Sequence, residues 1–249
     1  MKHTSIFIIS LLMLCSFFAT AQEKITDSIA VKDSLPVKTE RYGLRVGVDL
    51  YKLARSVYDE NYTGLEFTGD YRLTKKFYLA GEIGNENKTT EEDQLNFATK
   101  GTYFKVGFDY NGYENWLDME NLVYIGMRYG VSSFSQELNS YKIYNPNVYF
   151  GEQEEIILGK KFNGLTASWI EVVAGVKVKV FNNFFVGFSA RLNRIVSSKE
   201  PENFENLYIP GYNRTYNGEF GVGFNYTVSY FIPIYKAAAK AKPKAEKKE

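Results

Sequence analysis

The amino-acid sequence predicts an all-β fold, an antiparallel up-and-down transmembrane β-barrel of eight strands, with ten strands as the alternative. Three observations support this fold class. Apolar and polar residues alternate in about eight segments, the N-terminal segment is typical of secretion, and short and long connections nearly alternate. In the segment 219–231, Phe220, Val222 and Phe224 alternate with glycine and polar residues. Because successive side chains of a strand point to opposite faces, this strand has one apolar and one small, polar face.

Residues 1–21 have the features of a signal peptide. Lys2 provides a basic start, an apolar core covers 6–18, and the small residues Ala19 and Ala21 form a cleavage site. We expect cleavage near Ala21 and delivery of the mature chain to the outer membrane of the cell. Cleavage also removes Cys15 and His3, the only cysteine and the only histidine. Disulfides, Cys/His zinc sites and histidine acid–base catalysis are therefore excluded, and no metal or cofactor is expected.

The charge balance excludes a broad basic surface for nucleic acid. Loss of Lys2 from the 30 basic residues leaves as many basic as acidic residues, of which there are 29. Beyond residue 21, no apolar run approaches the roughly 20 residues of a membrane helix. Any crossing of a membrane therefore depends on strands.

The predicted barrel covers residues 41–235. Its strands are Tyr42–Tyr51, Thr63–Leu73, Phe77–Gly84, Thr102–Tyr110, Leu122–Ser132, Thr166–Val180, Phe184–Leu192 and Glu219–Phe231. Tight turns follow the second and sixth strands, whereas residues 85–98, 133–164 and 193–214 are predicted to form long loops. An additional hairpin within 144–158 would raise the strand count to ten.

Polar segments flank the predicted barrel. Residues 22–40 are predicted to be a flexible periplasmic leader, and the Lys/Ala-rich segment 236–249 a disordered tail. In the leader, Ser28 and Ser34 each follow an aspartate and precede an apolar residue, as in some bacterial O-glycosylation sites, although chance explains such short matches equally well. The basic tail is a candidate contact for anionic cell-wall polymers.

The orientation of the two strand faces separates two classes of barrel. A soluble lipocalin-like barrel shows the same alternation with its apolar face inside. Here the polar face is rich in glycine, which suits a narrow interior, while the large apolar side chains need more room than eight strands enclose. Tyrosines near strand ends suit an aromatic girdle at the membrane surface, and they are Tyr42, Tyr71, Tyr110 and Tyr230. The sequence thus favours apolar side chains that face lipid.

The polar face is predicted to carry a charge network within the lumen. Its members are Arg45, Asp49, Glu66, Asp70, Arg72, Glu82, Lys105, Asp109, Arg128, Glu171, Lys177, Arg191 and Glu219. Because buried charges must be paired, a filling of salt bridges is favoured over an ion path. Carboxylate pairs for acid–base chemistry, Asp49 with Asp70 or Glu66 with Glu82, have no spacing that distinguishes them, so no catalytic residue is expected.

Three stretches, 43–50, 69–75 and 78–86, resemble an uncharacterised family of Gram-negative outer-membrane barrel proteins. The resemblance covers about residues 40–235. It implies a membrane barrel in contact with outer-membrane lipid, lipopolysaccharide and the barrel-assembly machinery, and it implies no activity. We therefore expect a non-enzymatic protein with a structural or surface-binding role through its long loops. The alternatives are a narrow channel for small solutes, a histidine-free envelope enzyme and a soluble periplasmic lipocalin-like lipid binder.

Overall fold

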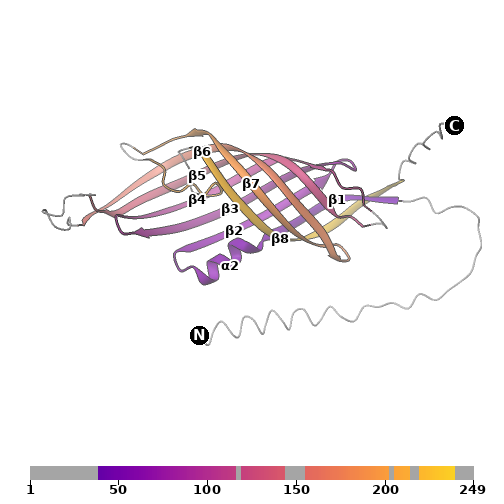
Figure 1. The fold of residues 1–249 in the computed structure, drawn as a ribbon, viewed down its shortest axis with the longest axis horizontal. Coiled ribbons are helices and arrows are strands. Elements are labelled where there is room, and N and C mark those ends of the chain that lie inside the picture. The colour runs from indigo at the N-terminus through magenta and orange to yellow at the C-terminus, as the bar shows by residue number, and fades with distance from the viewer. Residues whose placement is uncertain (1–38, 116–118, 144–154, 202–204, 214–218, 239–249) are drawn as a thin grey trace, which may run out of the picture. The chain divides into compact units, whose positions relative to one another are not determined.

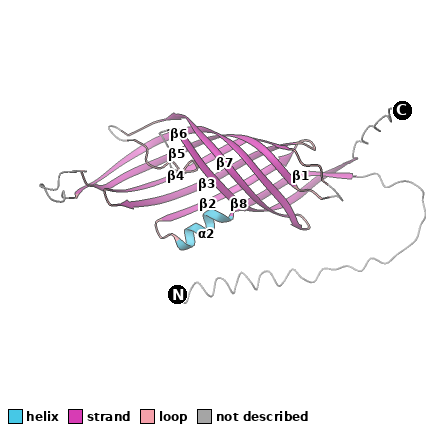
Figure 2. Cartoon of the chain, viewed as in Figure 1, coloured by secondary structure: helices cyan, strands magenta, loops and turns pink. Residues whose placement is uncertain are grey.

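The computed structural model is a closed barrel of eight antiparallel strands, each paired with its neighbours in sequence order (Figures 1 and 2). The structure describes residues 39–115, 119–143, 155–201, 205–213 and 219–238. Its elements are β1 (Thr39–Asp49), α2 (Leu50–Tyr58), β2 (Tyr62–Arg72), β3 (Phe77–Glu92), β4 (Leu95–Asn111), β5 (Leu122–Tyr141), β6 (Ile156–Phe181), β7 (Phe184–Ser198) and β8 (Phe220–Ala238). The predicted fold class is confirmed, with eight strands rather than ten across the described residues.

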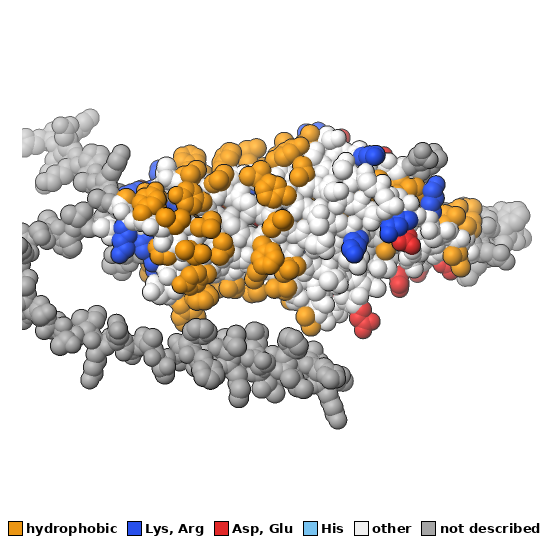
Figure 3. Space-filling view, turned by 180° about the vertical axis from the view of Figure 1, so that it is seen from behind, with side chains coloured by type: hydrophobic (Ala, Val, Ile, Leu, Met, Phe, Trp, Pro, Cys, Tyr) orange, Lys and Arg blue, Asp and Glu red, His pale blue; other side chains and the backbone are white. Residues whose placement is uncertain are grey.

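Apolar side chains point outward and charged side chains point inward. On β5, for example, Ile125 is 57% exposed whereas Arg128 is buried. Figure 3 shows the outward apolar side chains gathered in a broad band around the visible face of the barrel. Soluble proteins rarely expose contiguous apolar surface on this scale. The protein is therefore a transmembrane β-barrel, and the lipocalin-like alternative is wrong because its apolar face would point inward.

Aromatic rings gather near one end of this band. Three ring pairs with centroids 5.1 to 5.3 Å apart are Tyr42 with Tyr235, Phe77 with Tyr110, and Phe184 with Tyr230. Three of the four predicted girdle tyrosines thus lie in aromatic pairs between neighbouring strands. Such pairs stabilise cross-strand contacts.

Three predicted loops contain stretches of strand. Residues 85–92 continue β3 and residues 95–98 belong to β4, so that Asp93 and Gln94 alone form the turn. Similarly, the segment predicted as a loop at 133–164 contains the end of β5 and the start of β6, and residues 193–198 belong to β7. Outside the lipid band both faces of a strand are polar, so the apolar–polar alternation that identifies a membrane strand disappears. The extra hairpin considered within 144–158 falls mostly on residues outside the described part.

The first predicted strand ends two residues too late. Leu50 and Tyr51 belong to α2, because the Asp49 side chain accepts a hydrogen bond from the Tyr51 N–H (2.8 Å) and caps the helix. Leu50, Leu53 and Val57 recur at the three- and four-residue spacing of a helix face, and all three are exposed. No helix in the described part of the chain is long and apolar enough to cross a membrane.

The predicted boundaries at the two ends need small changes. Strand β1 begins at Thr39, inside the predicted leader, and β8 continues to Ala238, inside the predicted tail. All of β1, from Thr39 to Asp49, runs beside β8, with Thr39 opposite Ala238. The predicted signal peptide, the rest of the leader with Ser28 and Ser34, and residues 239–249 lie outside the described residues.

Candidate functional site

The middle of the barrel contains an ion-pair network built on two glutamates. Arg191 from β7 binds Glu82 of β3 through two nitrogens, at 2.6 and 3.0 Å, and reaches Glu171 of β6 at 3.0 Å. The Lys105 ammonium on β4 lies 2.9 Å from Glu171 and 3.6 Å from Glu82. All four side chains are buried. Each buried charge thus has an opposite charge beside it. A charged group that is removed from water needs such a partner, because burial of an unpaired charge is very unfavourable.

A second set of ion pairs lies toward the chain termini. Arg128 on β5 lies 2.7 Å from Asp109 on β4. Asp70 on β2 is 2.5 Å from the Lys177 ammonium of β6 and 3.8 Å from Arg45 of β1. The Lys177–Asp70 pair joins β6 to β2 across the lumen, whereas the other two pairs join neighbouring strands.

The third set centres on Lys52, which extends into the interior from α2. Its ammonium lies 2.8 Å from Glu66 and 2.5 Å from Glu86 and donates to the Tyr103 hydroxyl. The Tyr103 hydroxyl in turn donates to Glu66 at 2.5 Å. Asn225 of β8 donates to Glu66 at 2.8 Å. One lysine from the helix thus satisfies two buried carboxylates from the strands.

Residues 207–213, here called the inward turn, fold back into the barrel at the end opposite Thr39 and Ala238, here called the outer mouth. The Tyr208 hydroxyl donates to Glu86 at 2.6 Å, and the Gly211 N–H donates to the same carboxylate at 3.1 Å. The Tyr212 ring packs edge-on against Trp169, with centroids 5.6 Å apart. Gly211 has a positive φ of 81°, and a Cβ there would lie 2.4 Å from the Tyr103 ring. The inward turn therefore packs directly on the Lys52 cluster.

Most of the predicted network residues meet inside the barrel. Arg45, Asp49, Glu66, Asp70, Glu82, Lys105, Asp109, Arg128, Glu171, Lys177 and Arg191 all point inward, and the polar groups above join them into three clusters. The predicted carboxylate pairs are not brought together. Asp49 accepts from Asn225 while Asp70 binds Lys177, and Glu66 and Glu82 contact different cations.

Two predicted members lie outside these clusters. Arg72 lies at the terminal end of the barrel, where it pairs with Glu40 at 3.2 Å and donates to the Arg41 carbonyl oxygen. Glu219 precedes β8, has a side chain that is 58% exposed, and pairs with the exposed Arg194 at 3.2 Å. Placing Glu219 in the lumen was wrong because the strand begins one residue later.

Sequence reasoning missed several interior residues. Glu86 follows Glu82 and Gly84 on the inward face of β3, so a longer predicted strand would have included it. Lys52 gave no such signal, because a lysine on a short helix is normally solvated. No cluster of acidic, histidine or cysteine side chains with the spacing of a metal site occurs within the described ranges.

The terminal end of the barrel has its own charged cluster. Glu120, between β4 and β5, accepts from Arg41 Nε at 2.7 Å and lies 3.6 Å from the Lys179 ammonium. Burial raises the pKa of the Glu120 carboxyl, but the hydrogen bond and charge of Arg41 outweigh burial, so that its pKa lies below the ordinary value. The first residues of β1 are thereby tied to the opposite side of the barrel.

Comparison with known proteins identifies a family. The family model described as a domain of unknown function (DUF6048) matches residues 4–237. The chain belongs to this family. No curated protein matches the sequence. Among solved structures, the chain is similar to the crystal structure of Ail, the attachment invasion locus protein of Yersinia pestis, with 12% sequence identity, a TM-score of 0.38, and coverage of 77% of this chain and 97% of that chain.

The resemblance to an uncharacterised family of membrane barrels is thus confirmed by the family match and the barrel architecture. The family carries no assigned activity. The function of this member of DUF6048 has to be argued from its own geometry.

Proposed function

We propose that this DUF6048 protein is a non-enzymatic outer-membrane barrel with a closed lumen and a structural or surface-binding role. The observation that carries the proposal is the filled interior. Arg191 alone bridges β7 to both β3 and β6, and the inward turn packs on the Lys52 cluster at the outer mouth. Eight strands enclose a space that side chains just fill. This arrangement favours a closed barrel over the narrow solute channel.

The surface-binding part of the proposal rests on the strands that extend past the apolar band. The β3–β4 hairpin runs to a turn at Asp93 and Gln94, and β5 and β6 continue for a similar distance. Outward positions there include polar or basic side chains, such as Asn87, Lys100 and Ser133, and β6 adds the exposed Ile157 and Leu158. A paired sheet holds such groups in fixed positions, which favours a rigid binding surface over the long loops first expected.

The outer-membrane location rests on the barrel architecture together with the signal-peptide features of the sequence. Barrels of this class contact lipid and lipopolysaccharide through their apolar band, and they require assembly machinery for insertion. Envelope fractionation and gel mobility with and without boiling in SDS test this location. A heat-modifiable band in the outer-membrane fraction is expected, and a soluble periplasmic protein without a shift would contradict it.

Planar-bilayer recording tests the closed lumen. The purified barrel is added to both sides of the bilayer beside a porin as positive control, and no reproducible unitary current is expected. Unitary steps whose frequency increases with the amount of barrel would overturn the closed-lumen proposal and support the channel.

Unchanged lipid A in a deletion strain is the separate result expected of a protein without envelope enzyme activity.

A further inference from the structure

One section of the barrel wall is a helix instead of a strand. Strand β1 ends at Asp49, opposite Thr227 of β8, yet β8 extends outward from there to Phe220. On the other side, β2 extends from its last β1 partner, Phe67, out to Tyr62. Helix α2 contacts both β2 and β8, so it covers the interval that β1 leaves open (Figure 1).

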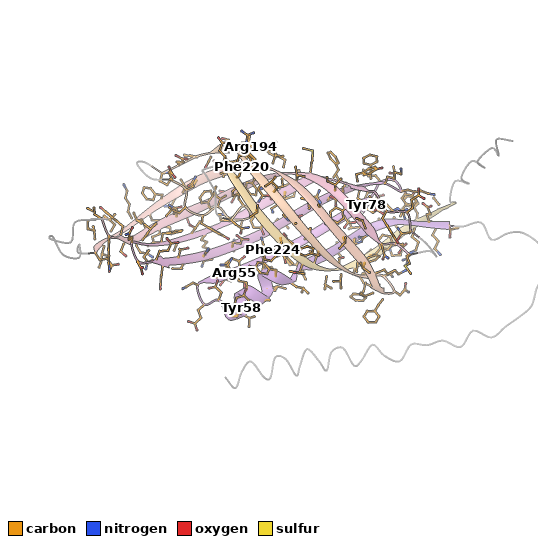
Figure 4. All side chains as sticks on the ribbon, viewed as in Figure 1. Arg55, Tyr58, Tyr78, Arg194, Phe220 and Phe224 are labelled. Carbon is orange, nitrogen blue, oxygen red and sulfur yellow. The ribbon has the colours of Figure 1, made fainter. Side chains whose placement is uncertain are left out.

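The two sides of α2 are held differently. Toward β2, the Ser56 hydroxyl accepts a hydrogen bond from the Gly64 N–H at 2.8 Å, and Lys52 binds Glu66. Toward β8, the Tyr51 ring packs on Phe224 with centroids 4.7 Å apart. No hydrogen bond joins α2 to β8 among the residues that the structure describes. Figure 4 labels Arg55 and Tyr58 on α2 and Phe224 on the adjoining part of β8. Asn225 of β8 donates to Asp49, which caps α2, and beyond this cap the α2–β8 seam is closed by packing.

A small polar cavity lies behind this seam. It has a volume of about 20 Å³, and its lining includes Tyr51 and Lys52 of α2, Phe224 of β8, and Arg191 and Asn193 of β7. Two buried atoms on this lining have no hydrogen-bond partner, Arg191 Nε and Asn193 Oδ1. Asn193 is only 1% exposed. One donor and one acceptor left unsatisfied in a buried site indicate a missing hydrogen-bonding group.

The charges around the cavity define the missing group. The lining has four cations, and each is paired with a carboxylate. Lys52 is paired with Glu66 and Glu86, Arg191 with Glu82 and Glu171, Lys105 with Glu171, and Arg55 with Asp59. An additional anion or cation would lack a counter-charge. A neutral hydroxyl or amide both accepts from Arg191 and donates to Asn193. The volume suits one group of about the size of a water molecule.

The outer side of the seam is apolar. Val57 of α2 is 74% exposed, and Leu53 on the same helix and Val222 and Phe224 on β8 are also exposed. These side chains continue the apolar band of the barrel. An amphiphile in the membrane therefore meets an apolar path that ends at a polar cavity.

We propose that the α2–β8 seam is a lateral binding site for a membrane amphiphile whose head is a single neutral hydroxyl, the size that the cavity admits. The head group lies between Arg191 and Asn193, and the hydrocarbon chain lies outside, along α2 and β8. Entry of the head requires the Tyr51 and Phe224 rings to separate. This site goes beyond the proposed function and does not depend on whether the extended strands bind a partner.

Binding of three lipids with the same chain tests the site. The folded full-length barrel in nanodiscs is titrated with oleyl alcohol, oleate and oleylamine, and bound lipid is counted by native mass spectrometry. Preferential binding of oleyl alcohol is expected, because its head is a single hydroxyl. Asn193→Leu removes the acceptor at nearly constant size, and about fivefold weaker binding is expected for the loss of one hydrogen bond. Asn139→Leu, on β5 away from the seam, is the matched control and leaves binding unchanged.

A reversible lock keeps the proposal testable if Asn193→Leu fails to fold. Tyr51→Cys with Phe224→Cys is bridged by a short bis-methanethiosulfonate reagent and released by reductant, so that one sample serves as its own control. Loss of oleyl alcohol binding on bridging and its return on reduction are expected. Equal binding of all three lipids, no binding, or binding that the bridge leaves unchanged would overturn the lateral site and leave water as the occupant. Bilayer recording separately decides the closed lumen.

Discussion

The wall between β2 and β8 has an inner half, toward the chain termini, and an outer half, where β2 and β8 extend past the end of β1. The two halves are closed in different ways. In the inner half, β1 pairs with β8 from Thr39 to Asp49 and with β2 from Leu44 to Val48. In the outer half, α2 takes the place of the strand and makes its contacts through side chains. Backbone pairing is available to almost any residue, whereas a side-chain contact depends on one particular residue. The outer half should therefore be the more sensitive to substitution.

The largest effect is expected at Lys52. Lys52→Ala leaves Glu66 and Glu86 without the ammonium between them, and breaking a buried ion pair costs about 3–5 kcal/mol. Denaturant unfolding of the barrel in lipid vesicles measures the loss in free energy of unfolding.

Arg45→Ala is the matched change in the inner half. It also removes a buried cation, but Asp70 keeps the Lys177 ammonium at 2.5 Å, so that a smaller loss is expected. An equal or greater loss for Arg45→Ala would contradict the difference drawn between the two halves.

Gly211→Ala asks whether the inward turn shares the sensitivity of the outer half. The positive φ of 81° costs a Cβ-bearing residue about 1–2 kcal/mol, and the new methyl group would lie 2.4 Å from the Tyr103 ring that contacts Lys52. Unfolding measurements should show a total loss of about 2–4 kcal/mol. Gly159→Ala is the control, because its φ is 59° and no atom lies within 4 Å of the added Cβ. Equal losses would show that the turn is not packed on Tyr103.

Ser56→Ala sharpens the comparison at the β2 side of the helix. The substitution leaves the buried Gly64 N–H without its acceptor, which costs about 1–3 kcal/mol. Ser56→Thr keeps the hydroxyl and should retain most of the stability in the same unfolding assay. If both variants were as stable as the unchanged protein, Lys52 rather than Ser56 would be the polar group that holds α2 to β2.

The sequence was sufficient for the barrel but not for this helix. Alternation over residues such as Val123, Ile125 and Met127 directly reflects lipid on one side, so the number of strands and the facing of most lumen residues could be predicted. The same alternation continues through Asp49 into Leu50 and Tyr51, and a period of two matched there by coincidence. The capping bond from Asp49 then starts a helix.

Only part of the site could be predicted from the sequence, and the reason is physical. Glu86 lies four residues after Glu82 and therefore on the same inward face of β3. A prediction that allowed strands to continue outside lipid would have included it. Lys52 and the inward turn are defined by contacts between segments distant in sequence, such as Gly211 N–H to Glu86. No local pattern encodes such contacts.

The smallest effect is expected at Glu120, which gives the inner half its own side-chain anchor. The pKa of this carboxyl is lowered in the folded protein by Arg41, so the unfolded chain binds the proton more readily. Its contribution to stability is complete above the unfolded pKa and is lost as the pH falls through the folded pKa. At pH 7, Glu120→Gln should cost up to about 1 kcal/mol, as a partly exposed pair does.

Unfolding measurements at pH 7 and pH 3 test whether the contribution of Glu120 to stability decreases at low pH. The stability difference between the unchanged protein and Glu120→Gln should shrink at pH 3, because the unchanged carboxyl is then increasingly protonated. Glu219→Gln, in the exposed pair with Arg194, is the control and should differ little from the unchanged protein at either pH. A Glu120→Gln deficit that stayed constant with pH would assign the effect to packing. In that case Glu120 would support the backbone pairing of β1 by packing and not by its charge.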